Sequence, residues 1–203
     1  MENIVQYLVR KYDPDSIIVY GSYADGSHNL GSDFDALVIS PHADQSRDVS
    51  FVDGIQLDVF VYPTEENLRC DQLPQLYNCR IVLDKYGKAA QLCDAVRNYI
   101  DEFPGKSDEE IAVNLAWCEK MLLRTSREDA EGYYRWHWVL CDSLEFYCDT
   151  RHKFYFGPKK TLRAMEREDP AAFAVYSDAL ASFDRTKLER WIKYLKSQED
   201  IKL

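Results

Sequence analysis

The chain has 203 residues, 46% hydrophobic and 30% charged, so it can form one large domain or two small ones, and it is not a disordered or low-complexity chain. Thirty-five acidic residues against twenty-five basic ones leave a formal net charge of −10. This charge argues against a nonspecific nucleic-acid or anionic-membrane binder, which needs a basic surface, and it suits a cationic partner or a cation cofactor.

The N-terminal part of the chain combines one helical segment with several short strands. Ile4, Tyr7 and Leu8 recur at helical spacing and predict a first helix. Asp53-Gly54 is a hairpin-type turn signal. Runs rich in β-branched residues predict strands at residues 16–20, 34–39, 55–62 and 80–83.

From Tyr86 onward the apolar spacing is helical. Pro104-Gly105 breaks the pattern, Ser107 and Glu110 form a capping box, and Asp184 is positioned as an N-cap. The predicted helices cover residues 89–103, 111–125, 129–153, a short segment after Gly157-Pro158, 171–182 and 185–198.

Strands give way to helices at the turn-like segment from Asp84 to Gly87. The predicted fold class is therefore α+β, with a small mixed β-sheet domain and flanking helices at residues 1–86. An all-α helical-bundle domain is predicted to follow at residues 87–203.

The first segment has no basic region ahead of an apolar run, and no uninterrupted apolar stretch approaches the ~20 residues of a membrane span. Six cysteines occur without CxxC or CxxH spacing, so they are expected to be reduced, buried small hydrophobes and not zinc ligands or disulfides. We expect a cytoplasmic protein without a membrane partner.

The chemistry-bearing residues lie where the first strand ends and the second begins. Gly21-Ser22 ends one strand, and amides plus a hydroxyl there can hold phosphate oxygens. Asp33 and Asp35 open the next strand two residues apart, so both carboxylates share a face and are candidate Mg²⁺ ligands. Asp58 is a third carboxylate inside an apolar strand, where an unpaired acid is unfavourable.

At these residues the sequence resembles the nucleotidyltransferase superfamily that includes DNA polymerase β, whose signature is Gly-Ser, a spacer of about ten residues, Asp-x-Asp and a later Asp. The order of domains is similar to that of the nucleotidyltransferases that modify kanamycin, other aminoglycosides and lincosamides. In those enzymes a minimal catalytic sheet domain precedes a helical substrate-binding bundle.

The resemblance implies two-metal nucleotidyl transfer, in which Asp33 and Asp35 hold both Mg²⁺ ions. The resemblance also implies that Asp58 coordinates the catalytic metal, and it makes Asp58 one candidate for the general base. The general base is left open, because in kanamycin nucleotidyltransferase-like enzymes it comes from the helical domain, where Glu131 and Glu145 are the candidates here.

The nucleotide is expected to contact Gly21, Ser22 and Lys160. Residues 155–160, Tyr-Phe-Gly-Pro-Lys-Lys, resemble a Tyr-Phe-Pro-Gly-x-Lys segment of some bundle-bearing nucleotidyltransferases, with Gly and Pro exchanged. Lys160 occupies the lysine position, and the alternative is a solvated lysine at a helix start.

The leading functional prediction is transfer of AMP from ATP, or of another nucleoside monophosphate, to a hydroxyl of a small acceptor. An aminoglycoside-like or lincosamide-like antibiotic is the first choice of acceptor, which makes antibiotic resistance a candidate role. The alternatives are a protein AMP-transferase of the toxin–antitoxin type and a non-catalytic nucleotide sensor. No nucleic-acid partner is expected, and a homodimer is left open.

The stretch from Tyr133 to Phe156 is rich in aromatic residues. Trp136, Leu140, Leu144 and Tyr147 recur at helical spacing and are expected to pack in a core. The remaining aromatic side chains are candidates for stacking on a base or an acceptor ring.

Overall fold

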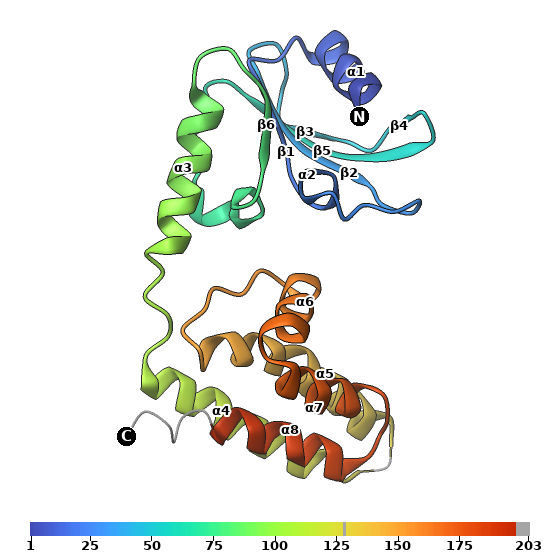
Figure 1. Cartoon of the computed structure of the whole chain (residues 1–203), viewed down its shortest axis with the longest axis vertical. Helices are drawn as coiled ribbons and strands as arrows, with labels where there is room; N and C mark the ends of the chain where they lie inside the picture. Colours follow the sequence, from blue (N-terminus) through green and yellow to red (C-terminus); the bar gives the residue numbers. More distant parts are fainter. Residues whose placement is uncertain (128, 198–203) are drawn as a thin grey trace. The chain divides into compact units, whose positions relative to one another are not determined.

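The strands of the N-terminal half pair into one mixed sheet in the order β3-β5-β2-β1-β6, with β4 paired to β5 (Figure 1). Strand β1 is antiparallel to β2 and β6, and β5 is parallel to β2 but antiparallel to β3 and β4. The strands are β1 (Ser16–Val19), β2 (Phe34–Ser40), β3 (Ser46–Asp48), β4 (Phe51–Val52), β5 (Ile55–Pro63) and β6 (Arg80–Asp84).

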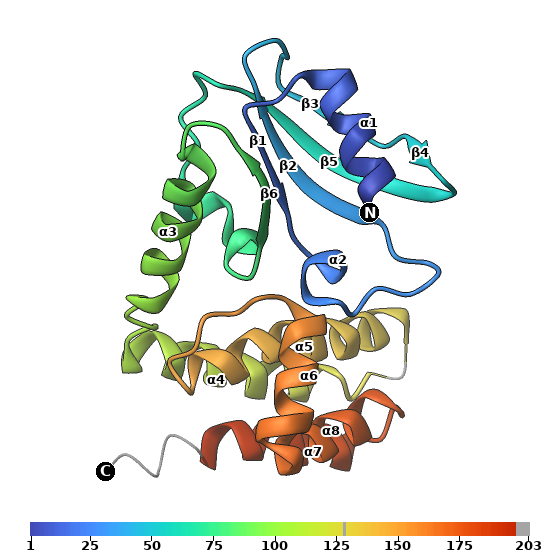
Figure 2. The same cartoon turned by 45° about the horizontal axis from the view of Figure 1, so that its top comes forward.

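Helices lie on opposite sides of this sheet (Figures 1 and 2). The sheet face covered by α1 is apolar, and Ile4 and Leu8 of α1 share a buried cluster with Phe34, Val38 and Val59. Side chains alternate along a strand, so these strand residues point to the same face. Helix α3 contacts β1 and β6. The helices of this half are α1 (Glu2–Tyr12), α2 (Ser22–Asp25), α3 (Lys88–Asp101) and the short 3₁₀ helices η1 (Cys70–Gln72) and η2 (Pro74–Leu76).

The predicted first helix and the four predicted strands are confirmed within a few residues at their ends. The hairpin turn is also confirmed, and Asp53 and Gly54 both adopt positive φ, 52° and 79°. Strand β3 was not predicted, because Ser46-Arg47-Asp48 has no β-branched residue and becomes a strand only by pairing with β5.

The computed structural model describes residues 1–127 and 129–197. The chain divides into two compact units, Met1–Glu102 and Phe103–Leu203. This division falls later than the 86/87 boundary expected from the sequence, because α3 packs onto the sheet unit through β1, β6 and the two 3₁₀ helices. The predicted fold class, α+β with a sheet domain followed by helices, is confirmed.

The second unit contains five helices within the described residues: α4 (Asp108–Arg124), α5 (Ala130–Asp149), α6 (Pro158–Glu168), α7 (Pro170–Leu180) and α8 (Arg185–Ser197). The capping box is confirmed, since the Glu110 amide donates to Ser107 Oγ at 3.3 Å and the Ser107 amide donates to Glu110 Oε2 at 2.9 Å. Asp184 also caps its helix, accepting from the Thr186 amide at 2.9 Å. The predicted last residue of that helix, Gln198, lies outside the described residues.

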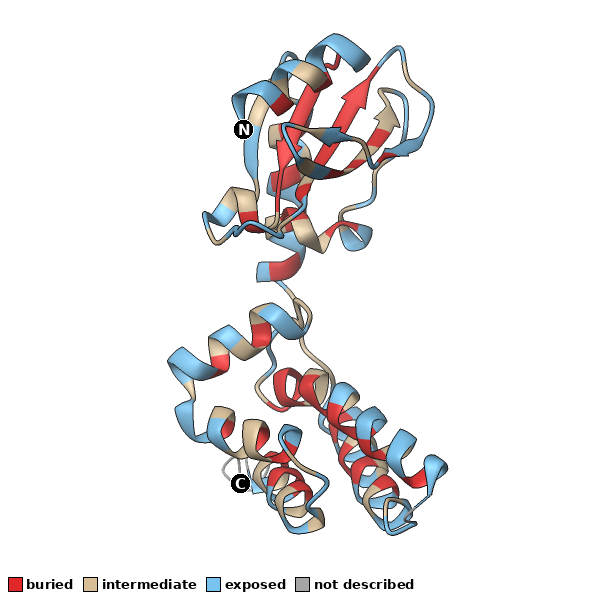
Figure 3. Cartoon of the chain, turned by 90° about the vertical axis from the view of Figure 1, so that its right-hand side faces the viewer, coloured by how far each residue is buried: buried red, intermediate tan, exposed pale blue. Residues whose placement is uncertain are grey.

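Helix α5 ends earlier than the predicted residue 153. His152 adopts a left-handed φ of 50°, and the Lys153 amide turns back to donate to the Cys148 carbonyl at 3.0 Å. The predicted packing of Trp136, Leu140, Leu144 and Tyr147 is confirmed, because all four are buried in the helical core. Figure 3 shows buried residues on the inner sides of these helices and along the strands.

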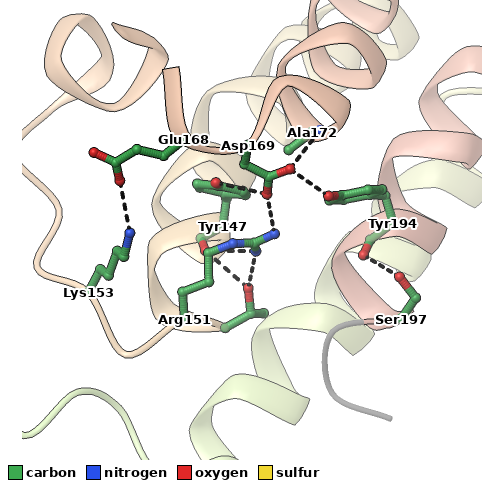
Figure 4. A network of polar contacts seen from close by, with 9 residues as sticks. Tyr147, Arg151, Lys153, Glu168, Asp169, Ala172, Tyr194 and Ser197 are labelled. Carbon is green, nitrogen blue, oxygen red and sulfur yellow. Dashed lines mark hydrogen bonds and ion pairs between the residues drawn. The ribbon is translucent and has the colours of Figure 1, made fainter. Parts of the chain in front are cut away.

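A polar network centred on Asp169 ties α5, α7 and α8 together (Figure 4). Asp169 Oδ2 accepts from Arg151 at 2.8 Å and from the Tyr147 hydroxyl at 3.1 Å, and Oδ1 accepts from the Tyr194 hydroxyl at 2.8 Å and the Ala172 amide at 3.1 Å. Burial acts to raise the pKa of Asp169, but these hydrogen bonds outweigh it and lower that pKa. The Asp169 carboxylate accepts four hydrogen bonds from within the protein, which indicates that its role is to hold these helices together.

The expectation that every cysteine is buried is wrong. All six are free thiols, but Cys141 is exposed, and Cys70 and Cys79 are partly exposed. Cys79 and Cys93 contact each other at 3.0 Å between their sulfurs. Cys141 lies on the exposed side of α5, although its neighbour Leu140 is buried.

Within the described ranges, no helix combines the length and apolar character that crossing a bilayer requires.

Candidate active site

The turn after β1 brings the backbone of Gly21 against the carboxyl group of Asp35. The amide of Tyr20 donates to the Asp35 carbonyl at 3.1 Å, and Gly21 follows with a φ of 64°. An ideal Cβ on Gly21 would overlap Asp35 Oδ2, closer than real Cβ contacts allow, and would lie 3.0 Å from Asp35 Cγ. Both the left-handed φ and the contact require glycine here.

Ser22 is the first residue of α2 and is buried, with 7% of its surface exposed. Amides in the first turn of a helix have no intrahelical acceptor, so those of Ser22 and Tyr23 are of the kind that binds phosphate oxygens. The Tyr23 ring stacks on His28 at 4.3 Å and meets Phe34 edge-on at 5.2 Å. These contacts fold the loop after α2 back toward the start of β2.

Asp35 and Asp58 are register partners on the parallel strands β2 and β5. Neighbouring strands lie about 4.8 Å apart, and register partners point to the same face, so the two carboxylates lie side by side. Asp33 is two residues before Asp35 and is exposed, just ahead of the first residue of β2. The structure therefore places Asp35 and Asp58 side by side on one sheet face, next to Gly21, with Asp33 at the same end of β2.

Tyr20 lies in the same electrostatic environment. Its ring is buried, and burial raises the pKa of its hydroxyl, which the negative charges of Asp35 and Asp58 raise further. Tyr20 is therefore a neutral, proton-bearing neighbour of the carboxylate pair at ordinary pH. The sequence analysis did not single it out.

Arg47 on β3 forms a two-pronged ion pair with Asp58. Its Nε lies 2.6 Å from Asp58 Oδ1 and its Nη2 lies 2.7 Å from Oδ2. The guanidinium also lies over the Phe60 ring, 5.3 Å from the centroid. The hydrogen bond to Asp58 raises the pKa of Arg47, so this side chain is charged throughout the physiological range.

This partner of Asp58 was missed from the sequence, although a signal existed. Arg47 is the only Lys or Arg between residues 12 and 68, in a region that contains many acids. The position of Asp58 inside an apolar strand is thereby explained in part, because its charge is paired and 24% of its side chain is exposed.

The donor set suits Mg²⁺, which prefers carboxylate oxygens and phosphates. Asp33 and Asp35 fit such an ion by residue type, and the missing side chain of Gly21 makes room for the Asp35 carboxyl group. Asp58 fits by type and register, but both its oxygens accept from Arg47. No group of three or more His, Cys, Asp or Glu side chains in residues 1–127 and 129–197 is already arranged around a common metal position.

The remaining predicted residues belong to the helical unit. Glu131 pairs with Arg135 at 2.5 Å and with Arg127 at 3.0 Å, and the hydrogen bond from Arg135 lowers its pKa, which weakens it as a base. Glu145 accepts from Lys106 at 3.2 Å. Lys160 lies in the first turn of α6 with its Nζ 5.2 Å from the Phe156 ring centroid.

Aromatic side chains outside the helical core form a surface on α4 and α5. Trp138 meets Trp117 edge-on at 5.3 Å and Tyr134 at 5.9 Å, and Trp117 also meets Phe146 at 5.8 Å. Tyr134 is 66% exposed and Trp138 is 39% exposed. These rings remain candidates for contact with a planar or sugar-like ligand.

The sheet unit, with its Gly-Ser turn and three carboxylates, has the features of a polymerase β-like nucleotidyltransferase. Comparison with known families agrees: residues 1–89 match the nucleotidyltransferase domain family. The N-terminal unit is therefore a nucleotidyltransferase domain, and the protein is an enzyme of the nucleotidyltransferase class. The resemblance of the N-terminal residues to the nucleotidyltransferase superfamily is confirmed.

Two solved structures are similar to this chain at low identity. A nucleotidyltransferase-like protein from Exiguobacterium sibiricum aligns over 98% of this chain and 72% of its own, with 12% identity and a TM-score of 0.45. A toxin–antitoxin structure with AMP-PNP aligns over 60% of this chain and 98% of its own, with 17% identity and a TM-score of 0.33. No curated protein matches the chain.

Proposed function

We propose that this protein transfers a nucleoside monophosphate, AMP from ATP, to a hydroxyl group of a small molecule and releases pyrophosphate. An aminoglycoside-like or lincosamide-like antibiotic is the acceptor class we favour. The observation that carries the proposal is the register pairing of Asp35 with Asp58, directly beside the glycine that approaches Asp35.

The residues of the sheet unit have separate tasks. Asp33 and Asp35 would hold two Mg²⁺ ions, with Asp58 as a further ligand, and the ions would stabilise charge on the attacking and leaving oxygens. The amides after Gly21 and the Ser22 hydroxyl hold and orient the triphosphate. Lys160 on α6 is a candidate for a further phosphate contact.

The acceptor hydroxyl attacks the α-phosphorus, its bond to phosphorus forms, and the bond to the pyrophosphate oxygen breaks. The hydroxyl proton goes to a carboxylate. Asp58 is favoured over Glu131, because Asp58 is the register partner of Asp35, one of the two proposed Mg²⁺ ligands, whereas Glu131 lies in the helical unit and is paired with two arginines. Glu145 stays the second candidate.

The helical unit is the proposed acceptor-binding part. The exposed rings of Tyr134 and Trp138 support this assignment, because ring-bearing acceptors stack on aromatic faces. The negative net charge of the chain suits a polycationic acceptor such as an aminoglycoside.

The test is pyrophosphate release by the purified protein with Mg²⁺ and each NTP against a panel of aminoglycosides and lincosamides, with mass spectrometry of the acceptors. ATP is expected to give an adduct of about +329 Da, the mass of an added AMP group. An adduct on a neighbouring gene product would support the protein-modifying alternative. Binding of Mg-ATP without release from any acceptor would support the sensor alternative.

Two variants connect the activity to the site. Asp35→Asn is expected to lower kcat by about 1000-fold or more, because a metal site supplies several kcal/mol and each ~1.4 kcal/mol is tenfold in rate. Asp71→Asn is the control, since Asp71 is an aspartate of the sheet unit that pairs with Arg69 and is not a candidate metal ligand. Full activity of Asp35→Asn, with a native circular dichroism spectrum in both variants, would refute the metal assignment.

A further inference from the structure

The pairing of Arg47 with Asp58 carries a further inference, which rests on the proposed function. We propose that Arg47 is a positioning residue of the transfer site. It holds Asp58 in the nucleotide-free enzyme, releases it when metal and nucleotide bind, and then contacts the triphosphate. Metal binding at Asp58 is thereby coupled to nucleotide binding.

The ion pair with Arg47 and the coordination of a divalent cation compete for the Asp58 carboxylate. Its two oxygens accept from Nε and Nη2 of Arg47 at 2.6 and 2.7 Å, so both are committed to one guanidinium. A cation at Asp58 would also lie next to the positive charge of Arg47, and like charges at such range repel. A metal at Asp58 therefore competes with Arg47 for the same carboxylate charge, and Arg47 lowers the metal affinity of the free site.

Arg47 is placed so that it can move away. It lies on β3, a strand of three residues at the edge of the sheet, and 56% of its side chain is exposed. The guanidinium also lies over the ring of Phe60, which is the register partner of Arg47 on the neighbouring strand β5. The two residues that the guanidinium contacts, Asp58 and Phe60, are themselves partly exposed.

The donor triphosphate provides the alternative partner. A guanidinium fork matches phosphate oxygens as well as carboxylate oxygens, and it retains its charge at any physiological pH. The site face otherwise presents Asp33, Asp35 and Asp58, so a triphosphate approaching it needs positive charge beyond the metal. Arg47 is the Lys or Arg that the sequence provides between residues 12 and 68.

The test is an equilibrium titration with Mn²⁺ alone, followed by the paramagnetic signal of the free ion, in the absence of nucleotide. Arg47→Gln is expected to bind Mn²⁺ about tenfold more tightly than the wild type, because it removes a competing cation. Arg47→Lys, which keeps the charge but loses the fork, is expected to fall between the two. Adding Asp58→Asn to Arg47→Gln is expected to abolish the gain.

Arg69→Gln is the matched control. Arg69 forms the same kind of two-pronged pair with Asp71, at 3.0 and 2.6 Å, and is similarly exposed. It is expected to leave Mn²⁺ affinity unchanged. A gain in Arg47→Gln that is absent from Arg69→Gln separates a role at the site from a general effect of losing an arginine pair.

Steady-state kinetics give the second readout. Arg47→Gln is expected to raise KM for Mg-ATP by about tenfold or more while kcat changes less, because a ground-state phosphate contact is lost. Unchanged or weaker Mn²⁺ binding by Arg47→Gln would overturn the inference, and so would an unchanged KM. Absence of nucleotidyl transfer by the wild type would instead overturn the proposed function, while the Mn²⁺ titration would still decide the role of Arg47 at Asp58.

Discussion

Asp48 is a buried carboxylate that fastens β3 to α1, and its removal is expected to destabilise the sheet unit. Its side chain is 2% exposed, and Oδ2 accepts from Lys11 Nζ and the Tyr12 hydroxyl, each at 2.9 Å. Oδ1 accepts from the Ser50 amide at 3.0 Å. Burial acts to raise the pKa of Asp48, but the bonds from Lys11 and Ser50 outweigh it and hold that pKa well below its ordinary range.

We expect Asp48→Ala to lower the free energy of unfolding by about 3 kcal/mol. Breaking a buried ion pair costs about 3–5 kcal/mol when the partner's charge is stranded. Lys11 is 40% exposed and can regain water, so the lower end applies. Asp44→Ala, a change at an exposed aspartate just before β3, is expected to stay within about 0.5 kcal/mol of the wild type.

Urea unfolding separates the two units. All four tryptophans, at positions 117, 136, 138 and 191, lie in the second unit, so their fluorescence reports on that unit. Far-UV circular dichroism reports on both units. Asp48→Ala is expected to move the sheet transition by about 1–3 M urea, at roughly 1–3 kcal/mol per molar, and to leave the tryptophan transition in place.

The effect also depends on pH with a defined sign. A carboxyl group whose folded pKa is depressed stabilises the protein above its unfolded pKa of about 4, and this contribution is lost as pH falls through the folded pKa. The difference between the wild type and Asp48→Ala is therefore largest near pH 7 and smaller at pH 3. A difference below about 1 kcal/mol at pH 7, or one that grows on acidification, would refute this reasoning.

Two further predictions concern the backbone of the site and a cysteine. Gly21→Ala is expected to destabilise the sheet unit by about 1–3 kcal/mol and to lower transfer activity more than tenfold, because it combines a φ of 64° with contact against Asp35. Gly26→Ala, with a φ of 76° and open space, supplies the strain without the contact, and equal activity losses in both would contradict the steric argument. Alkylation of Cys79 by iodoacetamide is expected to rise with pH with a midpoint near 7, because a hydrogen bond from Cys93 lowers its pKa to about 7. Buried Cys118, whose pKa burial raises to about 12, is expected to stay unmodified, and a flat rate for Cys79 between about pH 6 and 8 would contradict the assignment.

Local sequence signals were sufficient to predict the helix caps and the buried helix positions of the second unit. The capping box of Ser107 and Glu110 and the cap at Asp184 act through backbone groups within three residues, so the sequence is enough to place them. The buried spacing of Trp136, Leu140 and Leu144 follows from the period of the helix itself. Helix α5 ended early because the left-handed turn at His152 has no comparable local signal.

The Gly-Ser and Asp-x-Asp pattern was also readable without the structure. Gly21 is required by a tight turn, and Asp33 and Asp35 share a face because side chains on a strand alternate. Both constraints come from covalent geometry within a few residues. The sequence alone thus determined the class of the N-terminal unit, the order of a sheet part and a helical part, and the candidate ligands.

Only the tertiary structure decided what those ligands touch. The parallel pairing of β2 with β5 sets Asp58 beside Asp35, and the antiparallel pairing of β3 with β5 brings Arg47 onto Asp58. The same pairing buries Asp48 under α1, and the packing of α3 moves the end of the first unit to residue 102. These contacts join residues whose pairing is set by burial of a shared sheet face, a long-range effect that no short stretch of sequence encodes.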